Sequence, residues 1–553
     1  MSWIALADIL RTPHAARAVT PDLDHSELCR RALRLAAGLR ARNLERVALY
    51  LEDAGDLAIA LLGAWQAGAR VLLPADGQAQ TRQRLADQVD LWLDSLDDED
   101  DTAPLAATAL DLDSCQLILC TSGSSGEAKA INKTLRQLSN EVEALEQLWG
   151  PSLGAATLVG SVATQHIYGL LFRVLWPLCA GRPFLRRALP FPEDLQRASL
   201  DQPSFAWVAS PALLKRMGDN LDWPALRTVR RVFSSGGALP AQAAAALHQR
   251  LGQWPTEIYG SSETGGIAWR QGDETWQAFA GVELSLNAEG ALRLTSPYLP
   301  VGHCEQTADA VELQADGRFL LRGRLDRIVK LEEKRIALPM LEQALINHAW
   351  VADARLGVLQ EGRAFLGALL ALSPAGVHAL RNQGRRQLTE NLRRHLAGYC
   401  EAIALPRRWR LLRELPYNSQ GKLPQASVDS LLQAPRPTGI TPLTASEQDG
   451  EWQLQLEVPL DLAHFTGHFP QTPVLPGVVQ IDWAQQLARQ LIHDLPPRFA
   501  GMEVLKFQQL VRPGDRLQLS LRFDASRGKL YFAYRNGQAA CSSGRILLQA
   551  AHA

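Results

Sequence analysis

The amino-acid sequence predicts an α/β region followed by two α+β regions, and three observations lead to this expectation. Between about residues 45 and 270, short apolar runs alternate with helical patterns, as in mostly parallel sheets covered by helices. Residues 327–433 form a smaller mixed segment. After residue 450, one long helical pattern stands among about five strand-like runs, which suggests a helix wrapped by a curved antiparallel sheet.

The elements of the first region follow from local apolar patterns. Residues 46–52 (RVALYLE) predict a buried strand, residues 56–68 a helix that ends at a glycine, and residues 69–75 the next strand. Similar apolar runs predict further strands at 115–120, 156–163, 204–210, 230–237 and 256–260. Helical stretches separate several of these runs, which favours a parallel arrangement.

The last part of the chain begins with a change in composition. Residues 434–450 are rich in Pro, Gly, Thr and Ser, and we expect a linker there. A strand (451–458) and a Pro/Gly-rich loop (470–477) follow, and then a long helical pattern (478–495). Four further strand-like runs come after it, so residues 451–553 are expected to fold as a separate domain.

Length and composition exclude several classes of protein. A chain of 553 residues is too long for one hydrophobic core, so about two to four domains are expected. Apolar residues make up 46% and charged residues 21%, which is an ordinary globular composition. The formal net charge of −1 provides no global basic field for nucleic acid.

Other features of the sequence bear on its location in the cell. The apolar runs are shorter than the ~18 residues of a membrane span, and the N-terminal segment lacks the basic and then apolar pattern of a secretory signal. The seven cysteines are scattered singly, without the paired spacing of a zinc site or a disulfide framework. We therefore expect a cytoplasmic protein with no membrane span and no nucleic-acid partner.

A glycine-rich segment is the first candidate binding site. Residues 117–129 (LILCTSGSSGEAK) predict a strand that runs into a Gly/Ser/Thr loop ending at a lysine. Glycines let the backbone approach a phosphate, hydroxyls donate hydrogen bonds, and Lys129 supplies charge. The Lys-Ser/Thr ending of a Walker loop is missing. Taken alone, this segment is better explained as a flexible surface turn.

Further motifs along the chain change that interpretation, because they follow in a fixed order. They are QHIYGLL (165–171), VFSSGGALP (232–240), EIYGSSETGG (257–266), TAD (307–309), GRLDRIVKLEEKRI (323–336) and LPYNSQGKLP (415–424). Together with the glycine-rich loop, they resemble the motifs of the adenylate-forming superfamily of acyl- and aryl-CoA synthetases, luciferases and peptide-synthetase adenylation domains. The resemblance implies a large α/β N-terminal domain (1–325) and a small α+β C-terminal domain (326–433).

The resemblance also implies ATP and Mg²⁺ as cofactors and a role for each motif residue. The outgoing phosphates would be held by Thr121, Ser122, Gly123, Ser124, Ser125, Gly126 and Lys129. The nucleoside would be held by Gly237, Ala238 and Tyr259 at the adenine and by Asp309 and Arg324 at the ribose. Gly260 and Ser262, in the same motif as Tyr259, would also belong to the cofactor-binding set. Glu263 would hold Mg²⁺, and Lys422 would reach both the acid and the α-phosphate.

Four other positions concern the acid, the hinge and the acceptor. By resemblance, His166 would gate the acyl pocket, although a packed histidine is an equal alternative. Asp326 stands where relatives turn the small domain between two half-reactions. Glu332 and Glu333 replace the Gly-Gly that lines the pantetheine tunnel in many relatives. Ordinary CoA thioesterification is therefore in doubt, and the acceptor is expected to be the phosphopantetheine thiol of an acyl carrier protein or of CoA.

The small domain is rich in arginine. Nine lie between positions 381 and 413, namely Arg381, Arg385, Arg386, Arg393, Arg394, Arg407, Arg408, Arg410 and Arg413. They form either a solvated helix face or a docking surface for an acidic acyl carrier protein.

The C-terminal region resembles a second family. Residues 464–486 (HFTGHFPQTPVLPGVVQIDWAQQ) and 506–517 (KFQQLVRPGDRL) resemble the active-site loop, central helix and a strand of hot-dog-fold 3-hydroxyacyl-carrier-protein dehydratases. By resemblance, His468 would be the base, Asp482 the acid, and the Gly477 amide the donor to the thioester carbonyl. In that family the base and the acid come from different subunits, which implies a homodimer through residues 451–553.

These expectations together describe a bifunctional enzyme. An AMP-forming ligase would load a small carboxylic acid, by resemblance an aryl acid, onto a carrier protein. A fused dehydratase would act on carrier-bound 3-hydroxyacyl groups in an aryl polyene, xanthomonadin-type or fatty-acid-like pathway. The alternatives are a fatty acyl-CoA ligase whose hot-dog domain only dimerises and an AMP-sensing scaffold with a degenerate ligase.

Overall fold

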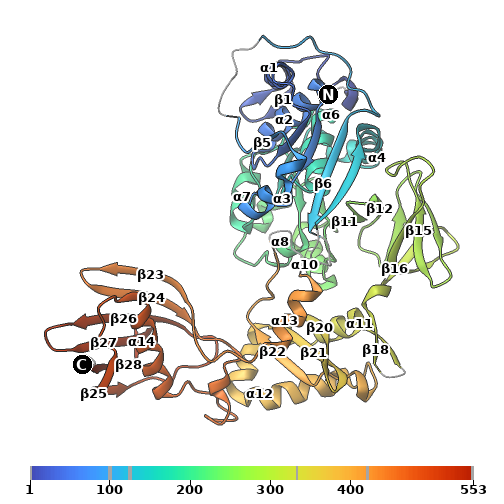
Figure 1. The fold of residues 1–553 in the computed structure, drawn as a ribbon. Coiled ribbons are helices and arrows are strands. Elements are labelled where there is room, and N and C mark those ends of the chain that lie inside the picture. The colour runs from blue at the N-terminus through green and yellow to red at the C-terminus, as the bar shows by residue number, and fades with distance from the viewer. Residues whose placement is uncertain (1–2, 97–102, 123–127, 332–333, 419–422, 550–553) are drawn as a thin grey trace. The chain divides into compact units, whose positions relative to one another are not determined.

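The computed structural model describes residues 3–96, 103–122, 128–331, 334–418 and 423–549 (Figure 1). The chain divides into two compact units. The first comprises Met1–Leu325 with Asn418–Lys422, and the second comprises Asp326–Tyr417 with Leu423–Ala553. Among the described residues, no helix combines the length and the apolar character needed to cross a lipid bilayer.

The first unit contains a five-stranded sheet in the order β5-β3-β4-β6-β7. Its strands are β3 (Arg46–Leu49), β4 (Arg70–Leu73), β5 (Leu91–Leu93), β6 (Gln116–Ser122) and β7 (Ala128–Thr134). The first four run parallel and β7 is antiparallel to β6. The helices of this part are α1 (His25–Ala41), α2 (Ala54–Ala67) and α3 (Ala79–Leu85), and a two-stranded sheet pairs β1 (Ala18–Thr20) with β2 (Leu23–Asp24).

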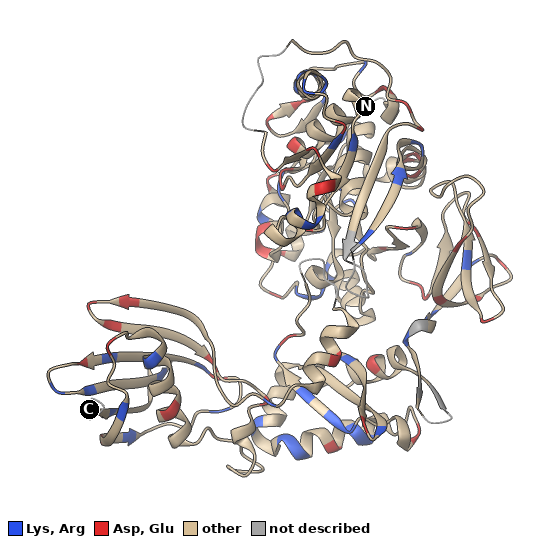
Figure 2. Ribbon diagram, in the orientation of Figure 1, with Lys and Arg blue, Asp and Glu red and all other residues tan. Residues whose placement is uncertain are grey.

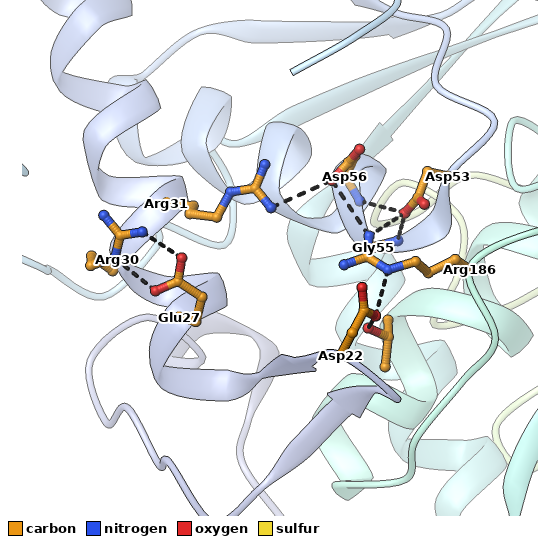
Figure 3. A network of polar contacts seen from close by, with 9 residues as sticks. Asp22, Glu27, Arg30, Arg31, Asp53, Gly55, Asp56 and Arg186 are labelled. Atoms are coloured by element: carbon orange, nitrogen blue, oxygen red, sulfur yellow. Dashed lines mark hydrogen bonds and ion pairs between the residues drawn. The ribbon is translucent and has the colours of Figure 1, made fainter. Parts of the chain in front are cut away.

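A polar network holds the start of α2 in place (Figure 3). Asp53 caps the helix by accepting hydrogen bonds from the amides of Gly55 and Asp56. The guanidinium of Arg186 lies 2.8 Å from carboxylate oxygens of both Asp53 and Asp22, and its hydrogen bond lowers the pKa of Asp22. One side chain therefore joins α2 to two segments that are distant in sequence.

The second sheet of this unit has ten strands in the order β14-β15-β16-β17-β13-β12-β11-β10-β9-β8. Its parallel part comprises β8 (Thr157–Gly160), β9 (Phe205–Ala209), β10 (Val232–Ser234) and β11 (Thr256–Ser261). Its antiparallel part comprises β12 (Gly265–Arg270), β13 (Thr275–Ala278), β14 (Glu283–Leu286), β15 (Ala291–Thr295), β16 (Glu305–Leu313) and β17 (Phe319–Arg324). The mostly parallel arrangement expected between about residues 45 and 270 is therefore found in β3–β6 and β8–β11, whereas β7 and β12 are antiparallel to their neighbours.

Helices separate the strands of the second sheet as the sequence pattern indicates. They are α4 (Leu135–Leu153), α5 (Ile167–Leu170), α6 (Trp176–Ala180), α7 (Pro192–Leu200), α8 (Pro211–Lys215), α9 (Trp223–Leu226) and α10 (Ala241–Leu251). The packing is dense: Trp149 of α4 lies against Trp176 and Phe233, with ring centroids 6.4 and 5.1 Å away.

The second unit begins with a small mixed domain. It contains the hairpin β18 (Ile328–Leu331) and β19 (Lys334–Ala337), the sheet β20 (Val351–Glu361), β21 (Arg363–Leu372) and β22 (Arg408–Leu412), and the helices α11 (Leu338–Ile346), α12 (Pro374–Leu396) and α13 (Gln425–Gln433). Leu341, Leu366 and Leu388 are fully buried in its core.

The C-terminal domain is a six-stranded antiparallel sheet packed against one long helix, α14 (Gly477–Leu491). The strand order is β23-β24-β26-β27-β28-β25, with bounds β23 (Pro442–Gln448), β24 (Glu451–Glu457), β25 (Arg498–Phe507), β26 (Arg516–Asp524), β27 (Lys529–Asn536) and β28 (Ala539–Gln549). Part of the expected linker over residues 434–450 is corrected, because residues 442–448 form β23, which pairs along β24 as a sixth strand.

Candidate active sites

The glycine-rich loop joins two antiparallel strands of the first unit. Thr121 and Ser122 end β6 opposite Lys129 and Ala128 at the start of β7. The remaining loop positions expected to bind phosphate, Gly123, Ser124, Ser125 and Gly126, lie outside the described residues. The ammonium of Lys129 lies 3.7 Å from a carboxylate oxygen of Glu263. Two motifs far apart in sequence therefore bring a cation and a carboxylate together.

The turn that carries Glu263 is fixed from both sides. Within the β11–β12 turn, Ser261 and Thr264 exchange hydrogen bonds between side chain and backbone, at 3.0 and 3.1 Å. From outside the turn, the ammonium of Lys133 donates to the carbonyl of Glu263 at 2.8 Å. Glu141 accepts from the amide of Gly266 at 2.7 Å. The turn thus has little freedom to move Glu263 away from Lys129.

Lys133 and Glu141 were not identified from the sequence. Lys133 is 3% exposed and also donates to the carbonyl of Tyr298 at 2.9 Å, while Glu141 is 6% exposed. Burial lowers the pKa of Lys133 and raises the pKa of Glu141. The two-residue period of β7 was an available signal, since it places Lys133 on the same buried face as Ile131.

Three of the residues expected at the nucleoside meet in one place. The hydroxyl of Tyr259 donates to Asp309 at 2.6 Å, and Asp309 lies directly opposite Arg324 on neighbouring strands, with a carboxylate–guanidinium distance of 3.7 Å. Burial, followed by the Asp309 charge, raises the pKa of Tyr259, so its hydroxyl stays protonated and remains a donor.

The turn after β10 carries the other two adenine positions. The hydroxyl of Ser235 donates to the carbonyl of Ile258 at 2.9 Å and so ties this turn to β11. Gly236 has φ 88°, which favours glycine, and it directs the chain outward. Gly237 and Ala238 are exposed. Ser262 is half-buried and Gly260 is exposed on the neighbouring β11–β12 segment.

This donor set fits a magnesium nucleotide. Lys129 offers a cation for phosphate, and Glu263 offers the hard carboxylate oxygen that Mg²⁺ prefers when substrate phosphates supply further ligands. Asp309 and Arg324 offer an acceptor and a donor for ribose hydroxyls. When bound, Mg²⁺ neutralises charge on the phosphates.

The remaining ligase positions are only partly described. His166 is half-buried and immediately precedes α5, a place that fits either of its expected roles. Asp326 lies in a 3₁₀ turn (Leu325–Arg327), and the division between the two units falls at this residue. Lys422, Glu332 and Glu333 lie outside the described residues.

In the C-terminal domain, the loop before α14 orients His468. Its ring Nδ1 lies 3.1 Å from the carbonyl of Val474, and the amide of Val474 donates to the carbonyl of His468 at 2.9 Å. Because a carbonyl can only accept, the ring proton sits on Nδ1 and the lone pair is on Nε2. Gly477 begins α14, where helix amides lack helical partners. A side chain there would meet the ring of Phe507, since an added Cβ would lie 2.6 Å from it.

Asp482 lies on α14 and is exposed in the single chain, where its carboxylate accepts from Gln486 at 2.8 Å. Its own chain therefore leaves this candidate acid open to solvent. Within the described residues, no hydrogen bond or ion pair joins Asp482 to His468. One chain thus holds both groups without bringing them into contact.

Basic residues recur along α12, where the arginine-rich segment begins (Figure 2). Several of these arginines make contacts that neither expected alternative included. Arg381 and Arg385 of α12 lie 2.6 Å from carboxylate oxygens of Asp515 and Asp461. Arg413, just after β22, contacts Glu457 at the end of β24 at 2.5 Å. Arg393, by contrast, donates to the carbonyl of Pro406 at 2.9 Å. Some of these arginines therefore bind the C-terminal domain of the same chain.

The fold and these sites define a protein with two enzyme domains, a ligase-type adenylation domain and a hot-dog domain. Comparisons with known proteins agree with this. A family described as AMP-binding enzyme matches residues 73–292, and a family described as ApeI dehydratase matches residues 444–545. The chain combines an AMP-binding domain with an ApeI-like hot-dog dehydratase domain.

Individual relatives match one domain each. A 4-coumarate–CoA ligase of Rhodobacter capsulatus is 27% identical over 314 residues, which is 56% of this chain and 75% of that protein. The 3-hydroxyacyl-[acyl-carrier-protein] dehydratase FabZ of Oenococcus oeni is 32% identical over 104 residues, which is 17% of this chain and 75% of that protein. Through its C-terminal domain, the chain belongs to this dehydratase family.

A solved structure extends the likeness in fold. A benzoate CoA ligase from Burkholderia xenovorans LB400 superposes with a TM-score of 0.63 at 20% identity, covering 77% of this chain and all (100%) of that chain. The N-terminal part thus has the fold of adenylate-forming ligases.

Proposed function

We propose that this protein activates a carboxylic acid with ATP, transfers the acyl group to the phosphopantetheine thiol of an acyl carrier protein, and dehydrates 3-hydroxyacyl thioesters on the same kind of carrier. The similarity to a 4-coumarate–CoA ligase supports an aryl acid as the substrate. The observation that carries the ligase assignment is the meeting of Lys129 with Glu263 in a unit where Tyr259 binds Asp309.

The ligase step uses charge and position more than covalent chemistry by the protein. The acid carboxylate attacks the α-phosphorus of ATP, and pyrophosphate leaves. Lys129 would stabilise the outgoing phosphates, and Lys133 and Glu141 fix the turn of Glu263, whose carboxylate would hold Mg²⁺. Asp309 and Arg324 hold the ribose, and Lys422 completes the in-line geometry. The carrier thiol then attacks the acyl carbon and AMP leaves.

The dehydratase step follows from the tautomer of His468. With its Nδ1 proton engaged by the carbonyl of Val474, Nε2 takes the proton from C2 of the substrate. The C2–C3 double bond forms as the C3–O bond breaks, and the hydroxyl leaves as water with a proton from Asp482. The Gly477 amide donates to the thioester carbonyl, where negative charge develops.

The dehydratase site is proposed to form across a homodimer. β25 lies at one edge of the six-stranded sheet, and its exposed apolar side chains are Phe499, Met502, Val504, Leu505 and Phe507. An apolar edge strand of this length favours pairing with a second copy. Since His468 and Asp482 do not meet within one chain, pairing would supply the missing partner of each.

The test is a pair of assays on the purified full chain. ATP–pyrophosphate exchange is measured with benzoic, cinnamic and fatty acids, and water loss is measured on a 3-hydroxyacyl carrier-protein thioester. Exchange with aryl acids that Lys422→Ala abolishes, and dehydration that His468→Ala abolishes, are the expected results. Exchange with fatty acids alone, or a wild-type chain that does not dehydrate, contradicts the corresponding half of the proposal.

A further inference from the structure

Helix α12 of the small domain is broken where it meets the C-terminal domain. Gly384 has φ 76° and ψ 167° inside the helix, a conformation that favours glycine. A Cβ added to Gly384 would lie 1.8 Å from the carbonyl oxygen of Pro470 and 3.2 Å from the Cα of Gln471. Pro470 follows His468 by two positions, so the helix backbone directly contacts the loop that carries His468 (residues 468–474, the dehydratase loop).

A second contact joins the same helix to the strand region behind that loop. The guanidinium of Arg381, one turn before Gly384, donates to the carbonyl of Pro513 at 2.8 Å and to the carboxylate of Asp515 at 2.6 Å. The other oxygen of Asp515 accepts from the amide of Arg512 at 2.7 Å. Asp515 is buried, so these bonds are little weakened by solvent.

Arg512 connects this contact to the candidate base. Its guanidinium donates to the carbonyl of Arg381 on α12 and, at 2.7 Å, to the carbonyl of Pro473 in the dehydratase loop. The next residue is Val474, whose carbonyl accepts the Nδ1 proton of His468. Hydrogen bonds therefore link α12 through Arg512 to Pro473, and the next residue along the backbone, Val474, holds the imidazole.

We propose that α12 is a positioning element for the dehydratase, and that Gly384 and Arg381 hold the loop 468–474 in the geometry that aims His468 at its substrate. This inference rests on the proposed dehydratase activity of the C-terminal domain. The small domain of the ligase thereby supports the active site of the C-terminal dehydratase domain. Gly384 and Arg381 are positioning residues, because they act through the loop and not on the substrate.

The first experiment compares two glycines whose φ angles are nearly equal, Gly384 (76°) and Gly362 (75°). Gly384→Ala introduces a Cβ against Pro470, whereas Gly362→Ala, at φ 75° in the β20–β21 turn, meets nothing within 4 Å. Both variants place an alanine at a positive φ, so Gly362→Ala controls for that part of the strain, and only Gly384→Ala adds a contact with the loop. For Gly384→Ala we expect at least a tenfold fall in dehydratase kcat with KM within about twofold, and unchanged ATP–pyrophosphate exchange.

A second comparison avoids any backbone strain. Arg381→Ala removes the bonds to Pro513 and Asp515, and Arg386→Ala on the same helix removes only an exposed pair with Glu390. Hydrogen–deuterium exchange is read at the amide of Val474, which donates to the carbonyl of His468. Exchange at least tenfold faster in Arg381→Ala than in Arg386→Ala is expected, with kcat reduced and KM retained.

The outcomes separate this inference from the proposed function. Equal dehydratase kcat in Gly384→Ala and Gly362→Ala, or equal exchange at Val474 in the two arginine variants, overturns the positioning role. A wild-type chain that does not dehydrate contradicts the proposed activity instead. Hydrogen–deuterium exchange at Val474 then still decides whether α12 holds the loop. If Gly384→Ala does not fold, the arginine pair decides the matter alone.

Discussion

Replacing Lys133 with methionine tests the support of the Glu263 turn. Methionine keeps most of the length of the side chain but removes the ammonium, which donates to the carbonyls of Glu263 and Tyr298 at 2.8 and 2.9 Å. Both carbonyls lose a charged donor, and Glu141 stays buried without the cation that favours its ionised form. The change thus leaves three polar groups less well satisfied.

The expected cost can be worked from these contacts. A hydrogen bond from a charged donor contributes about 1.5–3 kcal/mol, and removing one member of a buried charge pair costs about 3–5 kcal/mol. Methionine avoids the cost of burying the ammonium, which offsets part of the loss. We therefore expect Lys133→Met to lower the free energy of unfolding of the first unit by about 2–4 kcal/mol. The apparent Mg²⁺ requirement of ATP–pyrophosphate exchange should also rise, because the turn that carries Glu263 loses an anchor.

Urea unfolding followed by tryptophan fluorescence measures the first effect, with Lys215→Met, at an exposed lysine of the same unit, as control. Magnesium titration of the exchange rate measures the second. If Lys133→Met unfolds within about 0.5 kcal/mol of the control, the buried ammonium does not support the turn and the reasoning fails. If stability falls but the Mg²⁺ requirement does not change, Lys133 supports the fold and not the position of Glu263.

Three further predictions concern pH, assembly and the hinge. Burial lowers the pKa of His25 to about 4, so the unfolded chain takes up a proton at a higher pH than the folded chain does. About 3 kcal/mol of stability is therefore lost as pH falls from about 6.5 to about 4. In urea titrations, His25→Gln should flatten this pH dependence, whereas His378→Gln at an exposed site should not. Phe499→Arg on β25 should halve the molar mass measured by light scattering, and Leu443→Arg on the opposite edge strand should not. Equal masses for the two variants contradict β25 as the dimer edge. Asp326→Pro should retain ATP–pyrophosphate exchange and lose thioester formation, and unchanged product formation refutes the hinge.

In the first unit, the sequence predicts the buried parallel strands well and the partly exposed antiparallel strands poorly, for a physical reason. β3, β4 and β8–β11 are buried on both faces and read as continuous apolar runs. β16 is only partly buried along its length, so its sequence EQTADAVEL offers no apolar run to detect. The strand β23 was expected as linker for the same reason, since most of its residues are exposed.

The candidate sites show a similar division. Tyr259, Asp309 and Arg324 could be grouped from the sequence because their motifs are local and ordered along the chain, and the three residues lie together in the structure. Lys133 and Glu141 were missed because a lone lysine and a lone glutamate match no motif, and their meeting depends on how α4 packs. The contact of Arg381 with Asp515 joins positions 134 residues apart, and nothing local in the sequence indicates which carboxylate an arginine will bind.

The contacts between α12 and the C-terminal domain have the character of a permanent interface. Asp461 and Asp515 are 3% and 7% exposed, and each is met by an arginine of α12 at 2.6 Å. A carboxylate withdrawn from water is costly unless a cation remains beside it, so separating the two domains would leave these charges in partly apolar surroundings without partners. Arg436, in the segment that connects the domains, also lies 3.0 Å from Asp461 and therefore reinforces the same contact. A dehydratase loop held in this way depends on the neighbouring ligase domain, which gives a physical reason for the two activities to be retained on one chain.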